Sequence, residues 1–372
     1  MARFIHTADW QLGLRVRFIP GDAGAVVRDA RLRTVRRIGQ LARDEQADFV
    51  VVAGDVFEHH GLSPATLRKT FDAVADFPCP VYLLPGNHDP LTPDSLYRSP
   101  LWAKEAPSQL HVLGGTAPVE APGGAWLFPC PLLERHTLDD PTEHLTPDFG
   151  PQGVVRVGVA HGGIREILAP MMDDEDELAN AIRIDAAKAG ALDYLALGDW
   201  HGVLQVDART WYSGAPEATR FKEKRPGNVL LVDIDGPGAT PTVEERSVAT
   251  QTWVQHRLSV ANADDLTAID AFFDALPDKQ DTLVELFLEG TVDAATHAAL
   301  GALLARQGDR LCWLRRRDDS LAVLLHDADL DDIATDGWVR HVIDDLRPRA
   351  EVDPAARGAL HLLYRIHQEG AR

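Results

Sequence analysis

The stretch Leu84-Pro85-Gly86-Asn87-His88-Asp89 is the most informative part of this 372-residue sequence. It closes a short apolar run, residues 81–84, that we predict to be a buried strand, and it places an amide, an imidazole and a carboxylate directly behind that strand. Gly86 allows the backbone to approach a ligand closely. Because ligands collect at the carboxyl ends of strands in open α/β sheets, we expect polar residues behind other strands to lie near His88.

The first 250 residues alternate between short β-rich runs and segments with helical spacing. Strands are predicted at residues 4–6, 49–53, 81–84, 155–160, 194–197 and 228–234. Helices are predicted at residues 28–46, 64–75 and 174–188, with Asp or Ser near their starts. This alternation predicts an α/β fold with a substantially buried sheet.

Proline and glycine residues near position 240 interrupt this pattern, and the following region differs from the first. It predicts strands at 253–260, 282–288, 311–316 and 321–325, with helices at 264–275 and 294–307. We interpret this region as a small α+β domain, followed by a tail of two amphipathic helices split around Pro348 and Pro354. The expected domains are therefore residues 1–245, 250–335 and 337–372.

Five of the predicted strands are followed by residue types that bind metal ions. These residues are Asp9, Asp55, Asn87-His88-Asp89, His161 and Asp199-Trp200-His201. A two-metal hydrolase needs a carboxylate that bridges both ions, further oxygen and imidazole ligands, and a group that protonates the leaving oxygen. A single buried histidine is more often a hydrogen-bonded core residue than a ligand. Five such strand ends together favour a binuclear metal site.

These five motifs resemble those of the calcineurin-like binuclear metallophosphoesterases, which are written DxH, GD, GNHD, H and GHxH. The flanking residues 6–13, 52–57, 84–89, 194–198 and 212–216 are similar to those of the SbcD-type DNA repair nucleases. The resemblance covers about residues 1–235. It implies a β-sandwich flanked by helices that hydrolyses phosphodiester bonds, with a small capping domain beyond it.

The resemblance also implies roles for individual residues. One ion would be held by Asp9, Gln11, Asp55 and His201, and the other by Asp55, Asn87, His161 and Asp199. His88 would protonate the leaving oxygen, and Asp89 would orient His88. Gln11 and Asp199 depart from the family pattern, which has histidine at both positions. Because oxygen replaces nitrogen twice, the ligand set favours Mn²⁺, with Mg²⁺ as the alternative, over zinc.

The formal net charge of −20 argues against a protein that coats nucleic acid or an anionic membrane by bulk electrostatics. Local cations would have to draw phosphate instead. Residues 1–46 hold nine arginines against five acids, and residues 209–225 hold five basic residues against two acids. The candidate substrate-binding residues are Arg15, Arg17, Trp200, Tyr212 and Arg220. Trp200 either stacks on a base or packs beside the metal ligands.

The resemblance implies DNA as substrate and an SMC-like ATPase of the SbcC type as partner, docked through the C-terminal region. Packing of the tail helices on their own domain explains their amphipathic pattern equally well, and a homodimer is left open. Three widely spaced cysteines, Cys79, Cys130 and Cys312, favour the reducing cytoplasm. No apolar run approaches the roughly 18 residues of a membrane span, and no signal-peptide pattern is present, so we expect neither membrane insertion nor secretion.

We therefore predict a divalent-metal-dependent DNA nuclease that acts in DNA repair or in defence against foreign DNA. Two alternatives stay open at this point. One is a phosphodiesterase or phosphatase that acts on a small molecule. The other is a catalytically impaired scaffold that binds DNA or an ATPase, because Gln11 and Asp199 weaken the ligand pattern. The sequence does not distinguish exonuclease from endonuclease action.

Overall fold

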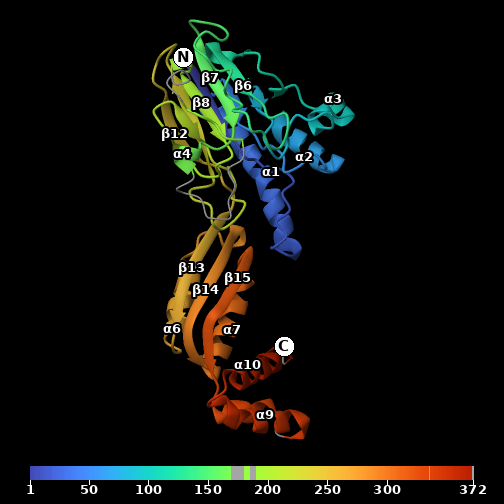
Figure 1. The fold of residues 1–372 in the computed structure, drawn as a ribbon, viewed down its shortest axis with the longest axis vertical. Coiled ribbons are helices and arrows are strands. Elements are labelled where there is room, and N and C mark those ends of the chain that lie inside the picture. The colour runs from blue at the N-terminus through green and yellow to red at the C-terminus, as the bar shows by residue number, and fades with distance from the viewer. Residues whose placement is uncertain (169–179, 185–189, 335, 371–372) are drawn as a thin grey trace. The chain divides into compact units, whose positions relative to one another are not determined.

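The structure, a computed structural model, describes residues 1–168, 180–184, 190–334 and 336–370 (Figure 1). The chain divides into two compact units, Met1–Thr252 and Trp253–Arg372. The first unit carries all five strand-end motifs. The second carries a three-stranded sheet and the C-terminal helices.

Two six-stranded sheets form the first unit. The first sheet contains β1 (Ala2–Thr7), β2 (Phe49–Val52), β3 (Val81–Leu83), β4 (Leu110–Val112), β11 (Asn228–Ile234) and β12 (Thr242–Ser247), in the order β12-β11-β1-β2-β3-β4. Strands β1 to β4 run parallel, whereas β11 pairs antiparallel with both of its neighbours. Parallel pairing brings the carboxyl ends of β1, β2 and β3 to one edge of the sheet.

The second sheet has a parallel centre and antiparallel edges. It contains β5 (Val119–Ala121), β6 (Ala125–Cys130), β7 (Val155–His161), β8 (Tyr194–Gly198), β9 (Leu204–Gln205) and β10 (Thr210–Tyr212), in the order β5-β6-β7-β8-β10-β9. Strands β6, β7, β8 and β10 are parallel, so that β7 and β8 also end on the same side.

Apolar side chains on the facing sides of the two sheets form a common core. Phe4 of β1 stacks on Phe49 of β2 with ring centroids 4.7 Å apart, and it meets Tyr194 of β8 edge to face at 5.6 Å. Aromatic contacts of this kind join the sheets as well as burying apolar area. The predicted fold, a β-sandwich flanked by helices, is confirmed.

Helices cover the outer face of the first sheet through a second core. They are α1 (Gly21–Asp44), α2 (Pro64–Ala75) and α3 (Pro100–Glu105), with short helices η1 (Leu96–Arg98), η2 (Pro122–Gly124) and α4 (Arg165–Leu168) elsewhere in the unit. Helix α1 begins seven residues before the predicted start at residue 28, because Gly21 and Gly24 conceal the helical spacing. Most of the helix predicted at residues 174–188 lies outside the described residues, and residues 180–184, which are described, are not helical.

The second unit is built on strands β13 (Thr252–Val260), β14 (Thr282–Asp293) and β15 (Trp313–Leu324), in that order. Helices α6 (Asp265–Ala275) and α7 (Ala294–Gly308) pack on the sheet, and η4 (Lys279–Asp281) precedes β14. The prediction of separate strands at 311–316 and 321–325 is wrong, since β15 is continuous. Its charged middle looked like a loop, but Arg315 and Arg317 form ion pairs with Glu285 of β14, at 3.3 and 3.0 Å.

Three helices end the chain: α8 (Asp327–Ile333), α9 (Gly337–Ala350) and α10 (Pro354–Gly370). Leu330, Ile343 and Leu360 form a small core among them. Helix α8 was not predicted. The two predicted tail helices are confirmed: α9 ends two residues after Pro348, and α10 begins at Pro354.

Candidate metal centre

The predicted ligand residues lie where five parallel strands end. Asp9, Asp55 and Asn87 follow β1, β2 and β3, whereas His161 ends β7 and Asp199 follows β8. Backbone hydrogen bonds hold the first two loops together. The amide of Asp9 donates to the carbonyl of Gly54 at 3.1 Å, and the amide of Gln11 donates to the carbonyl of Asp55 at 2.9 Å.

Four of the predicted ligand residues have a left-handed backbone. Their φ angles are 52° at Asp9, 43° at Gln11, 51° at Asp55 and 97° at Asp199. A non-glycine residue in a sparsely populated conformation costs about 1–3 kcal/mol, and such residues cluster at functional sites. The loops therefore hold these side chains in positions that stability alone does not favour.

Asp55 lies at the centre of the group. Its Oδ1 is 3.4 Å from Nε2 of His161 and accepts a 2.9 Å hydrogen bond from the backbone N–H of His88. Its side chain is buried. Ligand atoms of Asp9, Asp55 and His161 all lie within 4.8 Å of one another. One cation placed among them would contact two carboxylates and an imidazole, a set typical of divalent metal sites.

The ring of His161 is fixed by its other nitrogen. Nδ1 donates to the carbonyl oxygen of Ala53 at 2.8 Å, which leaves Nε2 facing Asp55 and Asp199. Such a bond sets the tautomer and the orientation of a metal-binding histidine. Gly54 is required here, because its φ is 92° and a Cβ at this position would collide with the His161 ring.

The orientation of the Asn87 side-chain amide bears on whether the site suits a cation. Its Oδ1 lies 2.9 Å from Nε2 of His161. Burial lowers the pKa of His161, but the neighbouring carboxylates, Asp55 above all, outweigh it and raise that pKa well above its usual range, so that Nε2 holds a proton when no metal ion is bound. In the opposite orientation the amide NH₂ donates to both oxygens of Asp55, at 3.1 and 3.0 Å. With the oxygen inward, the amide oxygen of Asn87 and the carboxylate of Asp55 both face Nε2 of His161, and a divalent cation can replace the proton held there. A divalent cation satisfies such a cluster, so the residues fit one.

His201 and Gln11 form a second group with Asp9. Nδ1 of His201 donates to Oε1 of Glu223 at 2.6 Å, and its Nε2 lies 4.0 Å from Oδ1 of Asp9. Nε2 of Gln11 lies 3.2 Å from the same Nε2 of His201. The amide of Gln11 therefore engages the imidazole nitrogen that the predicted first ion would use. Asp199 joins the group through its backbone N–H, which donates to both oxygens of Asp9 at 3.2 Å.

Burial and neighbouring charges shift the titration of these groups. Burial raises the pKa of Asp9 to about 7, and it also raises the pKa of Asp199. Burial lowers the pKa of His201, but the carboxylate of Glu223 outweighs it and raises that pKa to about 9. Buried carboxylates packed this closely repel one another unless protons or metal ions lie between them.

His88 is oriented by the loop that follows β2. Its Nδ1 lies 3.1 Å from the backbone carbonyl of Glu58 and 3.7 Å from Oε2 of the same residue. Its Nε2 lies 3.9 Å from Oδ2 of Asp55. Nδ1 therefore donates to Glu58, and the half-buried ring presents Nε2 to the candidate metal centre.

The expectation that Asp89 orients His88 directly needs correction. Asp89 is buried, and its oxygens accept hydrogen bonds from the backbone N–H groups of Phe57 and Gly86, at 3.0 and 2.8 Å, and from the hydroxyl of Tyr97, at 2.6 Å. These bonds join the loop after β3 to the loop after β2. Asp89 acts on His88 only through the backbone of these loops.

The candidate substrate-binding residues differ in their surroundings. Arg15 and Arg17 line a cavity beside the loop that carries Gln11. Arg220 is exposed, and its charge lowers the pKa of His201, so it lies near the site. Trp200 is half-buried and packs against a core on the outer side of the second sheet.

Tyr212 does not suit substrate binding, and that expectation is corrected. Its side chain is fully buried, its hydroxyl donates to the carbonyl of Gly162 at 2.9 Å, and it accepts a 3.0 Å hydrogen bond from the N–H of Ile164. It therefore fixes the loop that follows His161.

Sequence reasoning missed three residues that shape the site. Glu223 holds His201, Glu58 faces His88, and the buried guanidinium of Arg31 donates to the carbonyls of Trp10 and Ala218, at 3.1 and 2.8 Å. None of them lies in a strand-end motif. The one sequence signal for Glu223 is its place as an acid within the basic segment 209–225.

The sandwich, its strand-end carboxylates and its paired imidazoles define a metal-dependent phosphoesterase. The sequence profile of the calcineurin-like phosphoesterases matches residues 2–234, and the chain belongs to this family. Members of the family bind divalent metal ions, and Asp9, Asp55 and His161 form a candidate site for one here.

Curated relatives are more distant. An uncharacterized metallophosphoesterase, YhaO of Bacillus subtilis, is 23% identical across 98% of this chain and 92% of its own length. The D subunit of the nuclease SbcCD from the same organism is 26% identical across 65% of this chain and 68% of its own length. Its Rhodobacter capsulatus counterpart is 30% identical across 37% of this chain and 30% of its own length. Among the described helices, none is both long and apolar enough to span a membrane.

Proposed function

We propose that this chain is a divalent-metal-dependent nuclease that hydrolyses phosphodiester bonds in DNA. One observation carries the proposal: the buried carboxylate of Asp55 lies between Nε2 of His161, at 3.4 Å, and Nε2 of His88, at 3.9 Å. A candidate metal ligand, His161, and the candidate proton donor, His88, thus lie on either side of the carboxylate that would bridge the two ions. The similarity to two proteins named as components of the nuclease SbcCD supports DNA as the substrate.

The donor atoms divide into two sets that share Asp55. Asp9, Gln11 and His201 would complete one set, and Asn87, His161 and Asp199 the other. Two divalent ions held by these residues would polarise the phosphate, activate a water molecule and neutralise charge on the leaving oxygen. Because most of the donors are oxygens, we propose Mn²⁺, with Mg²⁺ as the alternative.

His88 supplies the proton that the leaving group needs. Its Nδ1–H is held by the carbonyl of Glu58, so the second proton of the imidazolium resides on Nε2, which faces the site. Water attacks phosphorus and releases one proton to solvent, the phosphorus–oxygen bond to the leaving oxygen breaks, and His88 transfers its Nε2 proton to that oxygen. Solvent then reprotonates His88. No covalent bond forms between phosphorus and the chain.

The partners and the location are part of the same proposal. We propose that the C-terminal helices dock on an SMC-like ATPase of the SbcC type, with a homodimer as a further arrangement. Trp338 of α9, 74% exposed, and Ile366 of α10, 55% exposed, are apolar side chains suited to such a contact.

The odd number of widely spaced cysteines supports a cytoplasmic location.

The purified chain, incubated with Mn²⁺ and labelled single- and double-stranded DNA, tests the proposal. We expect cleavage that EDTA abolishes and that His88→Ala lowers by about 100-fold or more, the usual contribution of a general acid. His136→Ala is the matched control, since His136 is exposed and distant from the motifs in sequence. No cleavage by the wild type, or equal cleavage by His88→Ala, would contradict the proposal.

The same assay includes bis-p-nitrophenyl phosphate, whose leaving group departs without a proton. We expect His88→Ala to lose less activity on this diester than on DNA. Rapid turnover of the diester with intact DNA would indicate a phosphodiesterase for small molecules instead.

One observation favours a second candidate, a scaffold that binds DNA or an ATPase without cutting. Nε2 of the Gln11 amide lies 3.2 Å from Nε2 of His201. It therefore competes with the first ion for this imidazole nitrogen. This candidate predicts fewer than two metal ions per chain and DNA binding without products.

A further inference from the structure

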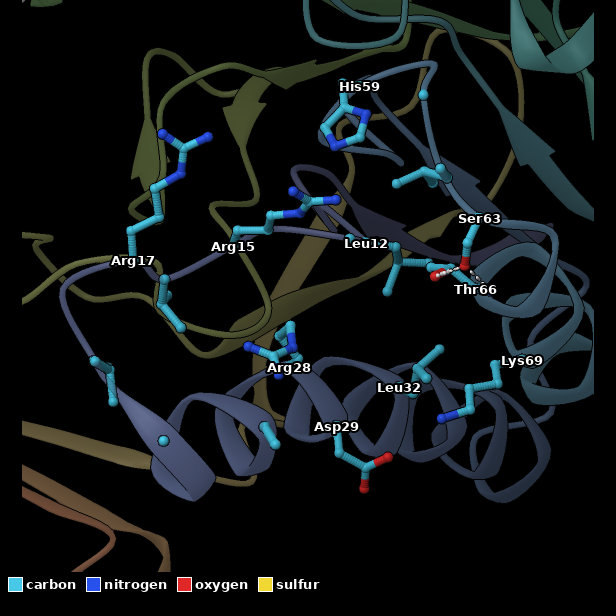
Figure 2. Close-up of a pocket in the computed structure, with 17 residues that line it drawn as sticks. Leu12, Arg15, Arg17, Arg28, Asp29, Leu32, His59, Ser63, Thr66 and Lys69 are labelled. Carbon is cyan, nitrogen blue, oxygen red and sulfur yellow. Dashed lines mark hydrogen bonds between the residues drawn. The ribbon is translucent and has the colours of Figure 1, made fainter.

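A cavity of about 810 Å³ opens beside the candidate metal centre, between the first turns of α1, the loop before α1 and the start of α2 (Figure 2). Its wall includes Leu12, Arg15, Arg28, His59 and Lys69. Ligand pockets usually enclose roughly 300–1,000 Å³, so this cavity is large enough for a nucleotide rather than a single ion.

The cavity is strongly cationic in an otherwise acidic chain. Arg15, Arg17, Arg28 and Lys69 line it, against one carboxylate, that of Asp29. Figure 2 shows the guanidinium groups of Arg15 and Arg28 turned into the cavity and the carboxylate of Asp29 turned away from it. Within the part of the chain that the structure describes, none of these four basic side chains makes an ion pair or a hydrogen bond.

The start of α1 adds to this positive potential. Gly21, the first residue of the 24-residue helix, lies in the wall, and Pro20 provides no side-chain hydrogen bond to cap the helix. The first N–H groups of a helix and its dipole attract anions, above all phosphate. The helix N–H groups and dipole would thus strengthen the attraction of phosphate to the arginines, which bind phosphate oxygens with paired N–H groups.

The cavity is continuous with the metal-binding loops. Leu12 pairs with the chain after Asp55: its N–H donates to the carbonyl of Val56 at 2.9 Å, and the N–H of Glu58 donates to its carbonyl at 3.1 Å. The residues just before this pairing are Gln11 and Asp55, and those just after it enter the cavity. Gln11 and Arg15 are four residues apart, which spans at most about 14 Å.

We propose that this cavity binds the sugar–phosphate backbone of a nucleic-acid strand, at phosphates within a few nucleotides of the bond that is cleaved. Adjacent stacked nucleotides rise about 3.4 Å per strand, so the separation of Gln11 and Arg15 corresponds to at most about four nucleotides. The proposal rests on the nuclease function proposed above and specifies its substrate class, a polynucleotide rather than a small phosphate ester. The half-buried apolar side chain of Leu62 in the wall would contact the sugars.

Equilibrium binding of a fluorescein-labelled 12-nucleotide single strand to the full-length chain in EDTA tests the cavity apart from cleavage. The variants are Arg28→Ala/Lys69→Ala, the charge-preserving Arg28→Lys/Lys69→Arg, and Arg36→Ala. Arg36 is the matched control, because it is exposed on α1 and does not line the cavity. Thermal unfolding of each variant shows that it is folded.

We expect the alanine pair to weaken binding by about tenfold or more. It should also make the slope of log K against log salt concentration shallower by about 1.4, since each contact between a cation and a phosphate contributes about 0.7 for a single strand. The charge-preserving pair and Arg36→Ala should bind as the wild type does.

No binding by the wild type, or an alanine pair that binds with the affinity and salt slope of Arg36→Ala, would overturn the assignment of the cavity. Cleavage of DNA by the wild type that the alanine pair retains at equal KM would also overturn it, and would leave the nuclease function standing. Binding that depends on the cavity without any cleavage would instead contradict the nuclease function alone.

Discussion

Nε2 of His161 and Oδ1 of Asp55 lie 3.4 Å apart although the two residues come from different sheets. The Nδ1–H of His161 is already donated to the carbonyl of Ala53, so its other nitrogen, Nε2, faces the buried carboxylate. Two acceptors at this distance repel unless a proton or a cation lies between them. A metal ion bound at this contact would therefore join the two sheets, so its binding would contribute to the fold as well as to the chemistry.

Asp9→Asn should stabilise the metal-free protein. Burial raises the pKa of Asp9 from 3.8 to about 7, so the folded state binds this proton more tightly than the unfolded state does. The contribution of Asp9 to stability is therefore greatest at acid pH and is lost as the pH rises from about 4 through about 7.

Thermal unfolding in EDTA between about pH 5 and about pH 8 checks this. The wild type should lose more stability over this range than Asp9→Asn does, and Mn²⁺ should restore stability only to the wild type. Asp22→Asn is the control, since Asp22 is exposed at the start of α1. If the stability of the wild type and of Asp9→Asn changed equally with pH, Asp9 would not titrate as a buried acid.

Glu223→Gln should weaken metal binding without touching a metal ligand. Its carboxylate accepts the Nδ1–H of His201 at 2.6 Å and orients the ring. Loss of such a partner typically lowers metal affinity by about 10–100-fold. Titration calorimetry with Mn²⁺ measures the effect, with Glu120→Gln as an exposed control. Equal affinities in the two variants would remove Glu223 from the site.

Gln11→His should strengthen the weaker of the two metal sites. Gln11 has a φ of 43°, a conformation that histidine tolerates better than most residues, and its amide now lies against His201. An imidazole at this position adds a nitrogen ligand, so we expect about tenfold tighter binding and a shift of preference toward zinc. Metal titrations with Mn²⁺ and Zn²⁺ measure both. An unchanged weaker site would mean that position 11 does not coordinate.

Asp89→Ala should destabilise the fold far more than His88→Ala does. Three donors to the Asp89 carboxylate, two backbone N–H groups and the Tyr97 hydroxyl, would be left buried without an acceptor. A loss of about 2–5 kcal/mol in the free energy of unfolding is expected, against less than about 0.5 kcal/mol for His88→Ala. Urea unfolding measures both. Equal stabilities, with activity lost in Asp89→Ala alone, would restore a direct catalytic role to Asp89.

The ligand positions could be predicted from the sequence because parallel strands end at one edge of a sheet. Asp9, Asp55 and Asn87 needed only that rule, since each directly follows a strand of the first sheet. Contacts between distant loops could not be predicted. Glu223 reaches His201 from 22 residues away, and no local spacing marks that pair.

Errors in the predicted elements came from local signals that tertiary contacts override. The charged middle of β15 is typical of a loop, yet Arg315 and Arg317 in it form ion pairs with Glu285 on the neighbouring strand. Tyr212 read as a substrate residue because it belongs to a flanking motif, yet its hydroxyl is used within the second sheet's own loop. A motif shows that a residue matters and leaves open whether it binds substrate or supports the backbone.

The location of Mn²⁺ in crystals of the chain tests the central claim most directly. Anomalous scattering should show two peaks about 3.5–4 Å apart, each about 2 Å from a carboxylate oxygen of Asp55, with His161 beside one peak and Asp9 beside the other. A single peak, or peaks that do not share Asp55, would contradict a binuclear centre bridged by that residue.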